Sequence, residues 1–516
     1  IRFGSINSVG QYAFQESYIT DIDLTGTSIT EIDQYAFANI KSLHKLTISK
    51  DVTSIGSNAF QNSIITELDI SKATSLQTIG ADAFNGGKIE SKVVFLPTLE
   101  SIGDRAFKDC RVLEEVDLSG ATALETIGEE AFMGTSLKVV KFSNGASLKY
   151  IGDSAFKDII SLTETGSTLI KARAINKNAF SGCINLVASI EITPSSSSND
   201  FYTASIGDSA FFNCYKIENL NMQEFGEFNS IGKSAFRNSG IQAITFPKIF
   251  SSISQNAFRN CSRLTGSPEG SLVIESIGFY AFQYDDKFQV SKIQTQAVGQ
   301  QAFEYCRSLK AEIIIDSEGS ISSNAFAYCG GLQSLQLTPQ ENDYLETTDK
   351  NDNSVLTRQS IGSGAFYRSS LGGDLVIPLT FTSIGSEAFA YCNLKSISIN
   401  GSDTIPQTIS SKAFYRAAPL QAANKFDLDL PFSVVDVGDY AFAHCPIETL
   451  SIYGTTLSHN VQGDYYTSTT IGKNAFESCS LMKTLTFDGF DILFDRTSFR
   501  GCQIESLSLG NIQVIP

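Results

Sequence analysis

The sequence predicts an α/β solenoid: a right-handed superhelix of about 20 repeats, with a parallel concave β-sheet and short helical turns on the convex side. A nine-residue phrase, of which "IGSEAFAYC" at 384–392 is one copy, recurs along the chain. A segment of alternating apolar and polar residues follows most copies. Neither segment buries its own apolar side, whereas stacked copies bury a continuous core. We therefore expect residues 1–516 to form a single solenoid with both ends cut within a repeat.

Each copy of the phrase is anchored on a phenylalanine. The residue before the anchor is alanine in nineteen of twenty copies, with Ser498 as the exception, and most anchors are 21–25 residues apart. Such regular spacing indicates one structural unit per copy. The anchors are Phe14, Phe37, Phe60, Phe84, Phe107, Phe132, Phe156, Phe180, Phe211, Phe236, Phe258, Phe282, Phe303, Phe326, Phe366, Phe389, Phe414, Phe442, Phe476 and Phe499.

The first half of the repeat has the pattern of a short helix. Its apolar positions fall at offsets 0, 4, 5 and 8, which line one stripe of one to two helical turns. The position four residues before the anchor is glycine in fourteen copies, with aspartate, asparagine or serine elsewhere. That preference indicates either a turn with positive φ or a close backbone approach.

The second half of the repeat has the pattern of a strand. Apolar and polar residues alternate in "LHKLTIS" at 43–49, "ITELDIS" at 65–71, "LKSISIN" at 394–400 and "IESLSLG" at 504–510. Alternation with period two predicts a short strand that has one buried face.

These two patterns together resemble the leucine-rich repeats of BspA-like and Treponema-type surface proteins. The resemblance covers essentially all of residues 1–516 and implies a leucine-rich-repeat superhelix. It also implies a secreted or cell-surface protein of host-associated bacteria or some protists that acts in adhesion. The family brings no catalytic residues, so none is carried over to this chain.

Composition and charge exclude several functions. The net charge of −17 disfavours nucleic acids and anionic membranes as partners, since both are bound mainly through lysine and arginine. No apolar run approaches the roughly 20 residues that span a bilayer, so we expect no membrane insertion within this chain. The sequence begins without methionine, which indicates a processed or truncated piece.

The ten cysteines all occupy one position, three residues after an anchor phenylalanine. Other copies have serine, glycine, threonine or alanine there, so the position selects for small size. We therefore expect free, buried thiols, although cysteines on neighbouring turns are within disulfide reach. The cysteines are Cys110, Cys183, Cys214, Cys261, Cys306, Cys329, Cys392, Cys445, Cys479 and Cys502.

The sequence offers little chemistry. The three histidines fall in different repeats, and no phosphate-binding, hydrolase or zinc-protease motif is present. We predict that the protein is not an enzyme and has no cofactor. A weak calcium candidate begins like an EF-hand loop with Asp349, Asn351 and Asn353, but the expected glycine and final glutamate are replaced by Ser354 and Ser360. A polar surface loop is the preferred interpretation.

Three insertions enter just after a strand, at 193–204, 338–358 and 454–470, and are expected on one edge of the solenoid. Such insertions often form a binding face, although loop length also varies at little energetic cost. Their aromatic residues are candidates for partner contact. These are Phe201, Tyr202, Tyr344, Tyr465 and Tyr466.

The outward positions of the first strands are acidic. This face is a candidate site for a basic partner or calcium, with a simple solvated face as the alternative. Asn400, in an Asn-Gly-Ser sequon after a strand, is a glycosylation candidate. The acidic positions are Asp21, Asp23, Glu67, Asp69, Glu114, Glu115 and Asp117.

Two functional hypotheses follow. The first is a non-enzymatic extracellular or cell-surface protein that binds a protein or glycan partner through its concave sheet and edge loops. The alternative is a structural building block of an extracellular filament or coat that self-associates through its solenoid ends, because open strand edges promote association.

Overall fold

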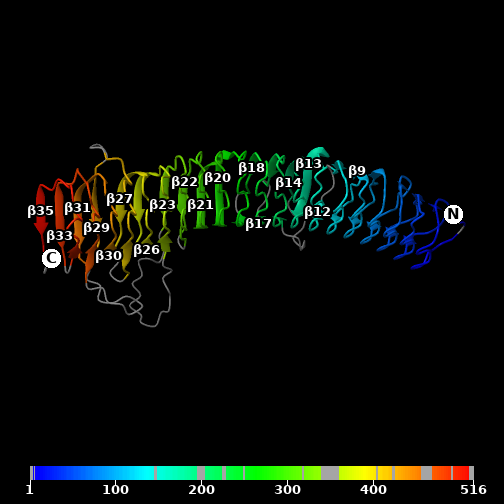
Figure 1. Cartoon of the computed structure of the whole chain (residues 1–516), viewed down its shortest axis with the longest axis horizontal. Coiled ribbons are helices and arrows are strands. Elements are labelled where there is room, and N and C mark those ends of the chain that lie inside the picture. The colour runs from blue at the N-terminus through cyan, green and yellow to red at the C-terminus, as the bar shows by residue number, and fades with distance from the viewer. Residues whose placement is uncertain are drawn as a thin grey trace, which may run out of the picture. The chain divides into compact units, whose positions relative to one another are not determined.

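The computed structural model describes residues 4, 6–143, 148–193, 204–222, 228–247, 250–316, 319–338, 359–401, 405–420, 425–454, 468–489 and 492–510. The chain divides into two compact units, unit 1 (Ile1–Leu264) and unit 2 (Thr265–Pro516). In each unit, parallel strands of successive turns stack beside one another in two rows (Figure 1). The major row contains the strands that the alternating segments predicted, and the minor row contains shorter strands that end at the isoleucine before the conserved glycine.

In unit 1, β13 (Glu164–Ile175) contributes to both rows. The other major-row strands are β1 (Asp21–Asp23), β3 (Lys45–Thr47), β5 (Glu67–Asp69), β7 (Ser91–Val94), β9 (Leu113–Asp117), β11 (Val139–Lys141), β14 (Val187–Ile192), β16 (Asn219–Asn221) and β18 (Ala243–Thr245). The other minor-row strands are β2 (Glu31–Ile32), β4 (Ser54–Ile55), β6 (Thr78–Ile79), β8 (Ser101–Ile102), β10 (Thr126–Ile127), β12 (Leu148–Ile151), β15 (Ser205–Ile206), β17 (Phe228–Ile231) and β19 (Phe250–Ile253).

In unit 2, β20 (Gly266–Ile277) and β21 (Gln289–Val298) are long strands paired in parallel with each other. The major row continues with β22 (Glu312–Ile315), β23 (Ser334–Leu337), β25 (Gly372–Ile377), β27 (Asn393–Ile399), β29 (Phe426–Leu430), β31 (Ile447–Tyr453), β33 (Thr484–Asp488) and β35 (Ser506–Leu509). The minor row contains β24 (Gln359–Ile361), β26 (Phe381–Ile384), β28 (Gln407–Ile409), β30 (Val434–Val437), β32 (Thr469–Ile471) and β34 (Ile492–Phe494).

The predicted strands are confirmed. Segments 43–49, 65–71 and 504–510 contain β3, β5 and β35, and segment 394–400 overlaps β27. Together the two units make about 18 turns of parallel β-solenoid, so the exact count of twenty repeats is not supported. A phrase in the sequence marks only an anchor, whereas a turn of the solenoid also requires its paired strands.

The prediction of short helical turns is wrong: the described residues contain strands and turns but no helix. The copy around Phe60 shows why. The Ala59 N–H donates to the Gly56 carbonyl (3.2 Å) and the Ser63 N–H to the Phe60 carbonyl (3.1 Å), which closes tight turns. Between them, the Phe60 N–H donates to the Ala83 carbonyl of the next turn of the solenoid (2.8 Å). Each copy of the phrase therefore forms tight turns and also donates backbone hydrogen bonds to the same phrase in the next turn of the solenoid.

The backbone angles of the phrase also exclude a helix. Asn58 and Asn62, two residues before and two residues after the anchor Phe60, have φ of 60° and 56°. A helix requires negative φ throughout and hydrogen bonds from residue i to i−4. We call the position two residues after the anchor the left-handed position, because positive φ recurs there in most copies.

The glycine that recurs four residues before the anchor is explained by close approach of the backbone of the neighbouring turn. A Cβ on Gly80 would lie 2.6 Å from the Ser57 nitrogen and 2.8 Å from the Gly56 carbonyl carbon of the neighbouring turn. The residue with positive φ is instead Asp82, two residues after Gly80. Of the two alternatives that the sequence left open, the close approach is correct at this position.

The core of each unit contains a stack of anchor phenylalanines. Ring centroids of successive anchors are 5.0–5.4 Å apart from Phe14 to Phe258 in unit 1. They are 4.9–5.4 Å apart from Phe282 to Phe499 in unit 2. Most of these rings are fully buried. Offset stacking of aromatic rings adds to the apolar burial that holds each turn on the next.

Candidate binding surfaces

The acidic residues that were predicted as site residues lie on major-row strands of unit 1. Strand pairing places each of them beside a particular residue of the neighbouring strand. Parallel pairing aligns Asp21 with Lys45 and Lys45 with Glu67. The Lys45 ammonium forms an ion pair with Glu67, and this contact raises the pKa of Lys45. The pairing of strands therefore inserts a lysine between two predicted acidic positions, which the sequence pattern alone did not reveal.

Three of the predicted aspartates hold the ends of their strands. The Asp23 Oδ1 accepts hydrogen bonds from the backbone and hydroxyl of Thr25 (2.9 and 2.5 Å). Asp69 accepts the equivalent bonds from Ser71 (3.0 and 2.6 Å), and Asp117 accepts them from Ser119 (3.1 and 2.5 Å). These are the short Asp-to-backbone bonds that stabilise turns. The recurring Asp-x-Ser/Thr pattern was the signal for this role.

Glu115 and Asp117 lie between two lysines from neighbouring strands. The Lys92 and Lys141 ammonium groups are each 2.9 Å from Glu115 Oε1, and they are 3.2 and 3.8 Å from Asp117 Oδ2. Hydrogen bonds from Lys141 and Lys92 lower the pKa of Glu115. Burial acts to raise the pKa of Asp117, but hydrogen bonds from Ser119 and Lys92 outweigh it, so this pKa is lowered.

The same face carries further cross-strand pairs. Lys138 Nζ is 2.6 Å from Glu114, and Lys171 Nζ is 2.7 Å from Glu191. The predicted acidic surface is therefore a face of mixed charge, on which lysines of one strand form ion pairs with carboxylates of a neighbouring strand. We call it the mixed-charge face; it runs over the major-row strands β3 to β14 of unit 1.

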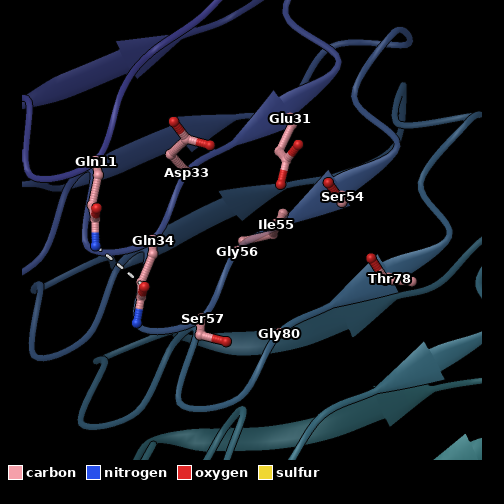
Figure 2. Close-up of a pocket in the computed structure, with 10 residues that line it drawn as sticks. All are labelled: Gln11, Glu31, Asp33, Gln34, Ser54, Ile55, Gly56, Ser57, Thr78 and Gly80. Atoms are coloured by element: carbon pink, nitrogen blue, oxygen red, sulfur yellow. Dashed lines mark hydrogen bonds between the residues drawn. The ribbon is translucent and has the colours of Figure 1, made fainter.

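A shallow polar hollow of about 510 Å³ lies over the minor row near the start of unit 1. Figure 2 shows Glu31 and Asp33 on one side of it and Gln11 and Gln34 on another, with Gln11 Nε2 donating to Gln34 Oε1 (3.2 Å). Its remaining lining residues are Ser54, Ile55, Gly56, Ser57, Thr78 and Gly80. The repeat pattern of the sequence did not point to the polar side chains of this hollow.

Several predicted site residues lie outside the described residues. They are Phe201, Tyr202, Tyr344, Asp349, Asn351, Asn353, Tyr465 and Tyr466. The partner-contact and calcium predictions for these residues stay predictions. Within the described ranges, no group of three or more histidine, cysteine, aspartate or glutamate side chains is arranged to hold a metal ion.

Asn400 directly follows β27 and its side chain is exposed. Its backbone N–H donates to the Ile377 carbonyl of the neighbouring turn (2.9 Å). The exposed amide is accessible to a modifying enzyme, so the glycosylation prediction stands as a proposal.

The prediction of free thiols is confirmed for all ten cysteines, nine of which are buried. Each Sγ also lies 2.9–3.3 Å from the carbonyl oxygen of the anchor phenylalanine in the neighbouring turn. In a copy without cysteine, Ser63 Oγ donates to the Phe37 carbonyl (2.7 Å). The position thus favours a small hydrogen-bond donor, which sequence reasoning recognised only as small size.

Sequence reasoning also missed a surface of unit 2. Six tyrosines, at the left-handed position or next to it, follow one another along successive turns. We call them the tyrosine ladder: Tyr284, Tyr305, Tyr328, Tyr367, Tyr391 and Tyr415. Aligning the copies on their anchors would have shown this column.

The stacked parallel strands, buried phenylalanine column and polar outer surfaces define a leucine-rich-repeat type of solenoid protein. Sequence comparison is more specific. The family model described as a BspA type leucine rich repeat region matches six times, at 3–90, 77–201, 173–284, 275–351, 359–445 and 460–516. The chain therefore belongs to the BspA-type leucine-rich repeat family, as the resemblance implied. A search of curated proteins finds no match.

Solved structures similar to this chain include a leucine-rich repeat protein from Bacteroides ovatus, with 17% identity, coverage of 97% of this chain and 88% of that chain, and a TM-score of 0.27. The pneumococcal vaccine antigen PcpA has 18% identity over 65% of this chain and 85% of its own, with a TM-score of 0.33. A leucine rich cell surface protein from Faecalibacterium prausnitzii has 17% identity over 66% and 90%, with a TM-score of 0.26.

The described part of the chain contains no helix that is both long and apolar enough to cross a bilayer.

Proposed function

We propose that this protein is a non-enzymatic recognition protein of the cell surface or extracellular space that binds a protein or glycan partner. The observation that carries the proposal is the mixed-charge face of unit 1. It is a continuous polar surface built from paired strands, whose side chains are oriented by their neighbours before any partner arrives. Membership of the BspA-type family supports the same function, because leucine-rich repeats generally bind partners.

The mixed-charge face suits a partner with both charge signs. Exposed ion pairs contribute little to stability, typically about 0–1 kcal/mol each, so their cross-strand arrangement is not explained by folding alone. Complementary charges at an interface increase association rates and select partners. A bound partner would form ion pairs with Lys45, Glu67, Lys138 and Glu114 in place of the pairs that these residues form with one another. All four side chains are at least partly exposed.

The test is a binding screen against extracellular-matrix proteins and a glycan array. In the variant K45E/K138E, we expect the affinity for any partner found to fall about tenfold or more at physiological salt, mainly through the association rate. The matched control is Lys157→Glu, which makes the same type of charge change on the anchor-phrase side of unit 1. If the array and the screen yield no partner, or if K157E weakens binding as much as K45E/K138E, the proposal fails.

Self-assembly through the solenoid ends stays a prediction. Sedimentation at increasing protein concentration tests it directly: a species that remains monomeric excludes a filament formed by this chain.

A further inference from the structure

The left-handed position differs sharply between the two units. In unit 1 it holds asparagine, aspartate or glycine in ten of eleven copies, with Glu16 as the exception. These residues adopt positive φ at little cost. In unit 2 the first seven copies instead hold tyrosine, arginine or histidine, with φ between 52° and 68°.

The bulky residues of unit 2 carry an energetic cost that the turn does not require. An L-residue with an ordinary side chain is disfavoured in the left-handed region, because its Cβ crowds the following carbonyl oxygen. Ring stacking offsets part of this cost. At this position, ten of the eleven copies in unit 1 use residues that avoid it. Residues held in costly backbone conformations concentrate at functional sites, so this column is a candidate for binding.

The tyrosine ladder changes its stacking along its length. Tyr284, Tyr305 and Tyr328 stack face to face, with centroids 5.3 and 4.6 Å apart and ring planes 13° and 7° apart. From there the planes turn by 82° between Tyr328 and Tyr367 and by 88° between Tyr367 and Tyr391. Neighbouring rings in this half of the ladder therefore meet edge to face, and Tyr391 is 37% exposed.

Arginines lie over the rings on alternate turns. The Arg368 guanidinium is 5.4 Å from the Tyr367 centroid and 4.7 Å from that of Tyr391, and its Nε donates to Tyr367 Oη (3.2 Å). The Arg416 guanidinium is 5.6 Å from the Tyr415 centroid. In the described part of the chain, neither arginine forms a salt bridge within 4 Å. Both cations therefore keep capacity for an anionic ligand.

These contacts limit the chemistry of the ligand. Neighbouring rings and guanidinium groups cover many of the tyrosine faces, which disfavours a sugar ring lying flat on them. Tyr284, Tyr391 and both arginines are exposed, and phenol hydroxyls and guanidinium N–H groups donate hydrogen bonds. A nucleic acid is disfavoured by the net charge of −17. The surface therefore favours a ligand with a row of free acceptors and spaced negative charges.

A polyproline II segment has both properties. It has no internal hydrogen bonds, so its carbonyls are free acceptors, and aromatic-lined surfaces are known to bind it. Its three residues per turn rise about 9 Å. Arg368 and Arg416 are two solenoid turns apart, and the anchor-ring steps between them are 5.3 and 5.2 Å. The spacing between carboxylates on successive polyproline turns is thus similar to the spacing between Arg368 and Arg416, so that each carboxylate would approach one arginine.

We propose that the tyrosine ladder of unit 2, with Arg368 and Arg416, binds an acidic proline-rich protein segment in the polyproline II conformation. This inference rests on the proposed function as a recognition protein and names one partner class for it. The ligand runs along the ladder, its carbonyls accept hydrogen bonds from tyrosine hydroxyls, and its carboxylates contact the two guanidinium groups.

The test is fluorescence anisotropy of a labelled fifteen-residue peptide of repeating Pro-Pro-Glu, titrated with the full chain. We expect saturable binding, and affinities at least about tenfold weaker for Pro-Pro-Lys and for Gly-Ser-Glu repeats of equal length. The double variant R368N/R416N should weaken Pro-Pro-Glu binding by about tenfold or more. Asparagine is chosen because it tolerates the left-handed region and therefore keeps the turn. Tyr391→Phe, which loses only the hydroxyl, should weaken binding several-fold.

Matched controls come from unit 1. Arg111→Asn removes an exposed arginine and Tyr215→Asn an exposed tyrosine, and neither should change binding. The proposal is overturned if all three peptides bind equally, if R368N/R416N binds like the wild type, or if the controls lose affinity equally. It is also overturned if ladder variants weaken binding to an acidic glycan or to single-stranded DNA rather than to the peptide.

A failure here leaves the proposed function standing, because that function is tested with variants of the mixed-charge face. Conversely, a chain that binds Pro-Pro-Glu through the ladder but loses no partner in K45E/K138E would place recognition on unit 2 instead of unit 1.

Discussion

The cysteine position shows how size and hydrogen bonding act together in a single residue. Cys110 is fully buried and its Sγ donates to the Phe84 carbonyl at 3.2 Å. That carbonyl lies within the anchor phrase and already accepts a hydrogen bond from the Gly87 N–H (3.0 Å). A small side chain fits beside it, and the thiol adds a second hydrogen bond to the same oxygen.

Replacing Cys110 therefore separates the two requirements. We expect Cys110→Ser to keep most of the stability, because Ser63 makes the same bond elsewhere in the chain. Cys110→Ala should lower the unfolding free energy by about 1 kcal/mol through loss of the hydrogen bond. Urea denaturation checks this through the midpoint at constant slope. An alanine variant as stable as the serine variant would show that size alone governs the position.

Thiol reactivity should also differ along the cysteine column. Burial raises the pKa of Cys110, Cys183 and Cys392 to about 12, so their reactive thiolate is scarce at neutral pH. Cys502 is only partly buried, and a hydrogen bond with Cys479 lowers its pKa. We expect iodoacetamide to label Cys502 first in the native protein. Peptide mapping by mass spectrometry checks the order, and Cys502→Ser should remove the fast phase.

At the scale of the element, the anchor phrase limits how closely two turns can approach. A Cβ on Gly128 would lie 2.5 Å from backbone atoms of Gly103 and Asp104. The same position in the first copy is Gly10, where an added Cβ meets nothing within 4 Å. The two glycines share sequence context but differ in their neighbours.

Gly128→Ala should therefore destabilise the protein by about 1–3 kcal/mol, because the clash is with backbone that cannot move aside. Gly10→Ala should change stability by less than about 0.5 kcal/mol. Denaturation curves of the two variants side by side provide the measurement. Equal losses would mean that the glycine is required for its backbone freedom rather than for close approach.

The strand-end aspartates give the major row a pH dependence. Hydrogen bonds from Ser71 lower the pKa of Asp69 below its unfolded value of about 3.9. A lowered folded pKa contributes stability above the unfolded pKa, and that stability is lost as the pH falls through the folded pKa. We expect stability to decline below about pH 4. Asp69→Asn keeps an acceptor oxygen without the titration, so its denaturation midpoint should depend less on pH in this range.

The same element shows what the sequence could and could not predict. Alternation predicted the strands of the major row because one face of each strand is buried. The anchor phrase was assigned to a helix because isoleucine, alanine and phenylalanine at offsets 0, 4 and 5 fit a helical stripe equally well. The structure places the isoleucine in a minor-row strand and the others in turns. Apolar spacing cannot distinguish these two arrangements, since both bury the same side chains.

At the scale of the whole molecule, most contacts join neighbouring turns, which is the behaviour of a quasi-one-dimensional repeat protein. The surfaces follow from this arrangement. The tyrosine ladder joins residues 21–39 positions apart in the sequence, and the ion pairs of the mixed-charge face join residues 20–26 positions apart. Neither was visible as a local motif, because each exists only once the turns are stacked.

Loss of one anchor should therefore act locally. Phe236→Ala removes a buried ring stacked between Phe211 and Phe258, at a cost of about 3–5 kcal/mol. We expect faster amide hydrogen exchange in β15, β17 and β19 and little change in β3 and β5 of the same unit. Uniformly faster exchange through unit 1 would contradict nearest-neighbour behaviour and indicate one cooperative domain.

The alternation of hydrogen bonds in the anchor phrase has a consequence for how such chains change length. Around Phe60, N–H groups at odd and even positions serve different partners, one within the turn and one across to the next turn. Deleting a single residue there would exchange the two sets and drive the phenylalanine outward. Natural length variation is therefore expected to spare the nine-residue phrase and to accumulate in the connections after the strands, where an added residue leaves this hydrogen-bond pattern unchanged.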